Sequence, residues 1–126
     1  MNDGELQKIV DAWITGMEAD RDASERESNR WAISEVIDWK YDGEAELLWR
    51  FVLAGYKREL SDKVLACLAA GPLEDLLSAF GAAFIDRVEE LARKDPQFNW
   101  LLGGVWRLAM TDEVWARVQA ARLKAW

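Results

Sequence analysis

Apolar residues recur every three to four positions along most of the chain, which is the pattern of helices that bury one face. The first run predicts a helix from about Asp3 to Asp20. A second helix is predicted to start at Ser24, which has the spacing of a capping box with Glu27, and to reach about Lys40. No stretch shows the strict alternation of a half-buried strand.

The third predicted helix starts near Glu44, after the turn signal Asp42-Gly43, and includes Tyr56. Its residues are apolar on nearly all sides. Such a helix either lies in the centre of a core or keeps one face for a partner. In the helix before it, Ile37 is expected to face inward.

A short fourth helix is expected to start at Ser61 and to end at Gly71, because glycine readily adopts the left-handed conformation that closes a helix. Pro72 suits the first position of a fifth helix, which is expected to reach Lys94. Together they predict a sharp corner. Gly81 lies within this helix, where glycine usually marks the close approach of a neighbouring backbone.

Asp95-Pro96 predicts the start of a short helix that ends at Gly103-Gly104. Residues 105–110 are a possible broken helical segment, and Thr111 is the expected cap of a last helix that runs to Trp126. The chain is therefore expected to be all-α, a compact multi-helix bundle or a short α-hairpin stack of about six to seven helices.

The length of 126 residues fits a single helical domain over residues 1–126 with one core. We expect no membrane span, because no apolar run approaches the roughly 18 residues that a bilayer requires. The acidic N-terminus is unlike a signal peptide, and the single cysteine, Cys67, cannot form an internal disulfide. These features indicate a cytoplasmic protein.

The net charge of −7 lies entirely in the first half of the chain. Residues 1–62 hold 15 acidic and 8 basic residues, whereas residues 63–126 hold 8 of each. A negative field repels nucleic acid and anionic membranes, so we expect no direct contact with either. The same field would attract a basic partner or keep the protein soluble.

Histidine is absent, which removes the commonest general base at neutral pH and a common metal ligand. Asp86, Glu89 and Glu90 are neighbours on one predicted helix, and such acids can bind Mg²⁺ or catalyse proton transfer. Arg87 and nearby cations favour a solvated, ion-paired face instead. We assign no catalytic, cofactor-binding or metal-binding residue.

The sequence holds eight tryptophans. Core packing is expected for Trp13, Trp100, Trp106 and Trp115, which lie on or near apolar stripes. The spacing does not settle Trp31 and Trp39, which project a quarter turn or more from the stripe of Ile33 and Ile37.

Trp39 lies eight positions after Trp31 on a similar side of the second predicted helix, and Trp49 and Tyr56 share a side of the third. Exposed aromatic residues are enriched in protein interfaces. The candidate partner-binding residues are Trp31, Glu35, Asp38, Trp39, Asp42, Glu44, Glu46, Trp49 and Tyr56.

The block from Lys63 to Val118 contains the strings VLACLAAGPLEDLL, FIDRVEE, DPQF and LLGGVW. It resembles a family of uncharacterised bacterial proteins that is known only as a domain of unknown function. The resemblance implies a small helical bacterial domain. It implies no activity, so no functional residue can be transferred from it.

The leading hypothesis is a non-enzymatic protein-binding module, an acidic inhibitor that occludes a basic protein partner. Small acidic proteins of this kind include immunity proteins and phage-encoded anti-defence proteins, which is an analogy. Two alternatives stay open. One is a carboxylate- or Mg²⁺-dependent enzyme, and the other is a homodimeric structural protein.

Overall fold

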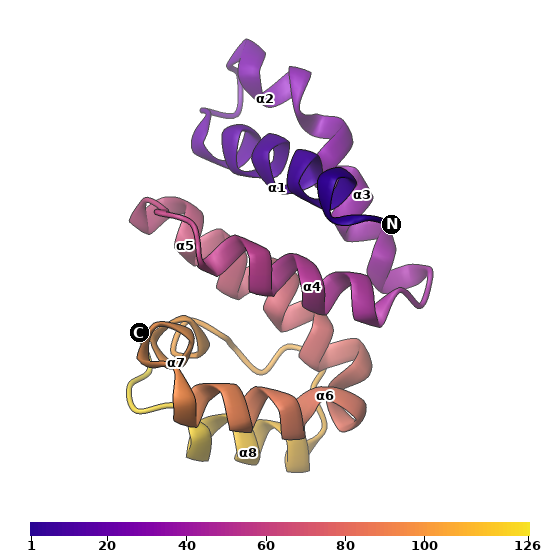
Figure 1. The fold of residues 1–126 in the computed structure, drawn as a ribbon. Coiled ribbons are helices and arrows are strands. Elements are labelled where there is room, and N and C mark those ends of the chain that lie inside the picture. Colours follow the sequence, from indigo (N-terminus) through magenta and orange to yellow (C-terminus); the bar gives the residue numbers. More distant parts are fainter.

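The helices stack in three tiers in the computed structural model, which describes all 126 residues (Figure 1). The first tier holds α1 (Asp3–Glu18), α2 (Ser24–Ser28) and α3 (Arg30–Tyr41). The middle tier holds α4 (Ala45–Tyr56), α5 (Asp62–Leu68) and a π-helical turn, η1 (Ala69–Leu73). The third tier holds most of α6 (Glu74–Lys94), together with α7 (Pro96–Leu102) and α8 (Asp112–Ala121). The prediction of an all-α compact bundle is confirmed.

Side-chain caps fix several helix starts where the sequence predicts them. The hydroxyls of Ser61 and Thr111 each accept a hydrogen bond, of 3.2 Å, from the backbone N–H three residues later. The Asp95 carboxylate accepts one of 2.9 Å at the start of α7. The predicted capping box at Ser24 does not form, because Ala23 holds the cap position and Ser24 lies inside α2. Asn29 then separates α2 from α3, so the second predicted helix is two helices.

The predicted corner at Gly71 and Pro72 is wrong. Both residues lie inside one helical run from Asp62 to Lys94, within the π turn η1. Gly71 is not left-handed, since Gly43 is the one glycine with a positive φ, of 75°. The wider π turn accommodates a proline that has no backbone N–H to donate, so the helix continues.

The chain turns back after Pro72, at Phe80 of α6, whose φ of −131° and ψ of 22° are not helical. There α6 is sharply kinked, and its second part returns beneath α4, so that α7 contacts α5 (Figure 1). Gly81 follows the kink, and a Cβ at this position would lie 2.9 Å from Cγ1 of Val114. A neighbour does approach closely, but it is a side chain of α8 and not the backbone that the sequence led us to expect.

The C-terminal part is less helical than predicted. Residues 105–110 form a loop in which Leu108 has a φ of 46°. The last helix, α8, ends at Ala121 and not at Trp126. Residues 122–126 form an irregular tail that packs back on Gly103 and Gly104.

One continuous core of 30 buried residues joins the three tiers, and α4 lies in its middle. Phe51 of α4 meets Trp13 of the first tier with ring centroids 5.3 Å apart. On the opposite side of α4, Trp49 meets Phe84 and Phe98 of the third tier at 6.0 and 5.9 Å. The apolar surface all round α4 is therefore explained by a central position.

The helical run from Asp62 to Lys94 is long and apolar enough to cross a membrane by length and composition alone, contrary to the expectation from sequence. Half of its most apolar window is buried inside the protein. A core helix of a soluble protein meets the same criteria, so the run is weak evidence for a membrane span.

Candidate functional site

Three of the predicted partner-binding aromatics are buried, so their assignment to an exposed face is wrong. Trp39 packs edge-on against Phe51 with centroids 5.9 Å apart. Trp49 and Tyr56 lie on the side of α4 that the third tier covers, and only 1% of Tyr56 is exposed. Helical spacing correctly places Trp49 and Tyr56 on one side of α4. Helical spacing does not show, however, that another tier covers this side.

Tyr56 has a structural partner at the start of α7. Its hydroxyl donates a hydrogen bond of 2.7 Å to Oδ2 of Asp95. Burial and this hydrogen bond to a carboxylate raise the pKa of Tyr56 above its ordinary value. The same bond, with the backbone N–H groups of α7, lowers the pKa of Asp95. The pair connects α4 to α7.

The outward side of α3 carries three exposed large apolar residues. Trp31 is 53% exposed and Tyr41 is 76% exposed. Ile37 is 48% exposed, so the prediction that it faces inward is wrong. Apolar side chains on the surface of a helix with a well-packed opposite side are available for contact with another molecule.

Carboxylates lie beside these apolar residues. Glu35, Asp38 and Asp42 are all exposed, and with Trp31 they follow the 4-3-4 spacing of one helical stripe. None of the three takes part in an ion pair. We call these residues the α3 face: Trp31, Glu35, Ile37, Asp38, Tyr41 and Asp42.

The two acids predicted after the turn differ from each other. Glu44 precedes α4, is exposed and makes no ion pair. Glu46 is exposed but pairs with Arg87 of α6, with 2.8 Å between Oε1 and a guanidinium nitrogen. Lys40, the one cation in the last turn of α3, pairs with Asp75 at 3.5 Å. The α3 face therefore keeps its negative charge, and Glu46 is partly neutralised.

The structure localises the net charge further than the sequence did. Residues 1–44 hold 12 acidic and 5 basic residues, which gives −7, and the remaining residues hold 11 of each. Residues 1–44 are the first tier and its exit turn (Figure 1). The whole excess of negative charge thus belongs to the tier that carries the α3 face.

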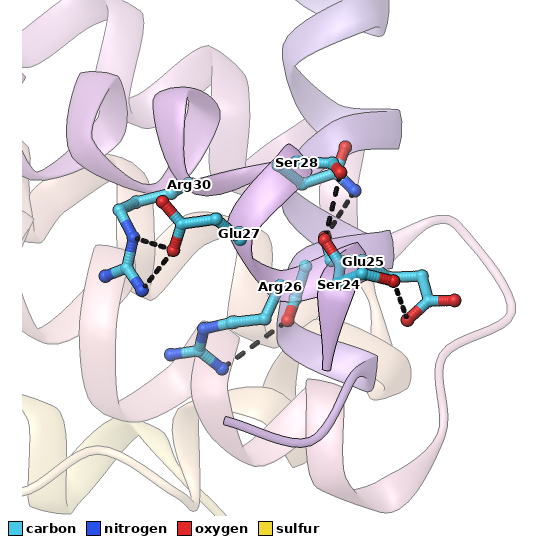
Figure 2. Close-up of polar contacts among 8 residues, drawn as sticks. Ser24, Glu25, Arg26, Glu27, Ser28 and Arg30 are labelled. Carbon is cyan, nitrogen blue, oxygen red and sulfur yellow. Dashed lines mark hydrogen bonds and ion pairs between the residues drawn. The ribbon is translucent and has the colours of Figure 1, made fainter. Parts of the chain in front are cut away.

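Short-range polar contacts hold the segment that leads into α3 (Figure 2). Arg30 turns back toward Glu27, with 3.0 Å between guanidinium and carboxylate. Arg26 reaches the backbone oxygen of Gly16 at 3.4 Å, and the Ser28 hydroxyl donates to the Ser24 backbone oxygen at 2.9 Å. The Arg30–Glu27 pair balances the cation closest to Trp31 in the chain.

Acids and cations form ion pairs across α6 and α8, which confirms the expected paired face. Arg117 of α8 contacts Asp86 and Glu89, each at 2.5 Å, and Lys94 contacts Glu90 at 2.8 Å. The hydrogen bond from Arg117 lowers the pKa of Glu89. The main cation is Arg117, which the sequence analysis did not consider, because it lies 28 residues beyond Glu89.

No group of three or more cysteine and acidic side chains in the structure could hold a metal ion. A hollow with a volume of about 540 Å³ lies where α1 meets α2, lined in part by Glu18, Asp20 and Glu25. Glu18 is engaged there by the Ser61 hydroxyl at 2.6 Å.

Two tryptophans expected in the core are exposed. Trp106, in the loop between α7 and α8, is 67% exposed, and Trp100 is exposed on α7. Trp126 of the tail stacks on Trp100, with centroids 5.8 Å apart. Sequence spacing could not place Trp106, because the burial of a loop residue depends on what packs over the loop. Of the other two, Trp13 is buried as predicted and Trp115 packs partly buried against the core.

The sequence matches a known family over residues 19–126, and that family is described as "Family of unknown function (DUF6869)". No curated protein and no solved structure matches the chain.

Proposed function

Because the chain belongs to this family of unknown function, we propose its function from its own surface: it binds a basic protein partner through the α3 face and acts without catalysis. One observation carries the proposal. Trp31, Ile37 and Tyr41 are exposed beside three carboxylates that no cation of this chain neutralises.

Each component of this face has a role in association. Unpaired carboxylates attract a basic surface and raise the rate of encounter. Large, exposed aromatic residues contribute most of the binding free energy once a partner buries them. Glu44 extends the negative surface past the end of α3, whereas Glu46 contributes less because Arg87 pairs with it.

The proposed outcome of binding is occlusion of the partner's basic surface, in the cytoplasm. Immunity proteins and phage anti-defence inhibitors act in this way, and these two classes are the first to test by analogy. Residues 1–44 concentrate the charge that such a mechanism needs.

The test starts with capture of partners from a lysate of the native host at low salt, and identifies them by mass spectrometry. The decision comes from variants of the purified pair. Glu35→Lys with Asp38→Lys should weaken binding at least about tenfold and flatten its salt dependence. Trp31→Ala should weaken it about 30-fold, the effect of a residue worth about 2 kcal/mol.

The matched control is Asp20→Lys with Asp22→Lys. It changes the net charge by the same amount, in the same tier, at exposed residues outside α3. Equal effects of the two double variants would show that only total charge matters, and the α3 face would then be rejected. If light scattering shows a dimer that Trp31→Ala dissociates, the face serves self-association instead.

A further inference from the structure

A second exposed apolar surface lies in the third tier, away from the α3 face (Figure 1). Four large apolar side chains from α7, the following loop and the tail build it. We call them, with two neighbouring cations, the C-terminal face: Trp100, Trp106, Leu123, Trp126, Arg122 and Lys124. Leu123 is 90% exposed, so nothing in the chain covers it.

The tail that carries part of this face is held in place by specific contacts. The Trp126 backbone N–H donates to the Gly103 backbone oxygen at 2.9 Å, and its indole N–H donates to the Trp100 backbone oxygen at 2.6 Å. The Leu123 N–H donates to the buried side-chain oxygen of Asn99 at 2.9 Å. Leu123 is therefore presented on an anchored segment and not on a free end.

The charge of this face is opposite to that of the first tier. Arg122 lies over the Trp115 ring at 5.0 Å, and Lys124 lies over the Trp100 ring at 5.9 Å. Neither cation pairs with a carboxylate. Residues 96–126 hold four basic residues, but Arg107 and Arg117 pair with carboxylates, so Arg122 and Lys124 are the two cations of this region that no carboxylate neutralises.

The shape of the face disfavours a partner that inserts side chains. The hollow between Trp106, Trp115 and Trp126 has a volume of about 60 Å³, which is room for about two waters. The apolar side chains instead project from a loop and an irregular tail. A second copy of the same face would bring together two surfaces that each carry Arg122 and Lys124, and surfaces of like charge repel.

We propose that the C-terminal face docks on an anionic lipid bilayer. Tryptophan is enriched at the boundary between water and hydrocarbon, where its ring is apolar and its N–H stays wet. Leu123 enters the acyl region, while Lys124 reaches a lipid phosphate. Arg122 adds its positive charge from a fixed place, since its guanidinium donates to the Val105 backbone oxygen at 2.9 Å. The expectation of no membrane contact rested on the negative field of the first half of the chain, and that excess charge lies in residues 1–44, in another tier than this face.

Flotation of the full chain with vesicles tests the proposal. The probes are vesicles of phosphatidylcholine alone, and of phosphatidylcholine and phosphatidylglycerol in equal amounts. The wild type should float with the anionic vesicles only, and less as salt rises. Lys124→Glu should lower the partition constant roughly 25-fold, since each charge near the surface contributes about fivefold. Leu123→Ser with Trp106→Ser should abolish flotation.

The control is Trp31→Ser, which removes another exposed indole, that of the first tier, and should float like the wild type. The altered residues are exposed, so circular dichroism should show all variants folded. Absence of flotation at low salt would overturn the proposal and leave the face to an acidic protein segment. Equal flotation of Leu123→Ser with Trp106→Ser and the wild type would overturn it as well.

Discussion

Gly104→Ala should detach the C-terminal tail and destabilise the protein. A Cβ at this position would lie 2.5 Å from Cζ2 and Cη2 of Trp126 and 2.9 Å from Cβ of Ala69. Ala69 belongs to the central helical run and cannot move without disturbing the core. The indole is therefore the group that moves.

The magnitude follows from what the tail loses. Trp126 is 37% exposed, so roughly 150 Å² of it is buried, worth about 4 kcal/mol at about 25 cal/mol per Å². Its two hydrogen bonds, to Gly103 and Trp100, add about 1 kcal/mol each. Release of residues 124–126 returns about 1–2 kcal/mol of conformational entropy per residue. The lost contacts minus the regained entropy leave a decrease of about 2 kcal/mol in the free energy of unfolding, which corresponds to a Tm lower by about 8 °C.

Two assays separate detachment from general damage. Urea unfolding measures the loss of stability, and limited trypsin digestion with mass spectrometry measures cleavage after Lys124, whose backbone oxygen packs against Gly103 in the docked tail. Gly71→Ala is the control, because its Cβ would meet nothing within 4 Å and alanine favours a helix by about 1 kcal/mol. Wild-type stability and cleavage rate in Gly104→Ala would refute the reasoning.

Three further substitutions test the polar contacts. Burial raises the pKa of Glu74, so its charged form destabilises the fold as pH rises. Glu74→Gln should therefore be more stable than the wild type in urea near neutral pH but not at about pH 4. An equal gain in stability at both pH values would contradict this cause. Arg117→Gln should lower the free energy of unfolding at neutral pH, because it leaves Asp86 and Glu89 without their cation. Because Arg117 lowers the pKa of Glu89, that decrease should shrink as acid protonates the carboxylate, and a pH-independent decrease would rule the ion pair out. Tyr56→Phe should cost about 1 kcal/mol and raise the pKa of Asp95 toward its ordinary value in a carboxyl NMR titration; an unmoved Asp95 would refute the assigned cause.

Features that depend on near neighbours in the sequence were predictable. The caps at Ser61, Asp95 and Thr111 need only a side chain and an N–H two or three residues away. The amphipathic stripes gave the fold class for the same reason. The prediction of a capping box at Ser24 was wrong because the spacing alone does not decide which residue precedes the first turn of the helix.

The π turn has no signal in the spacing of apolar residues. Leu68, Ala69, Pro72 and Leu73 are all buried, and they follow the three- and four-residue steps of an ordinary α-helix. The Gly71-Pro72 pair drew attention to a corner, whereas the sharp bend at Phe80 has no such signal.

Exposure of aromatic residues depended on the stacking of tiers, which spacing does not contain. Trp49 and Tyr56 lie on one side of α4 as predicted, yet the third tier covers that side. Trp106 lies in a loop that no element covers. The acids on α3 were easier to place, since carboxylates without a partner stay in water.

The uneven burial of the tryptophans makes the protein spectroscopically informative without any label. Indoles that are buried among other rings emit at shorter wavelength than indoles in water, and soluble quenchers reach only the latter. Trp31 is the one strongly exposed tryptophan of the first tier, and Trp106 is the most exposed of the third. Occupancy of either surface should therefore change the quenchable, long-wavelength part of the fluorescence, while unfolding should shift the part that comes from Trp13, Trp39 and Trp49.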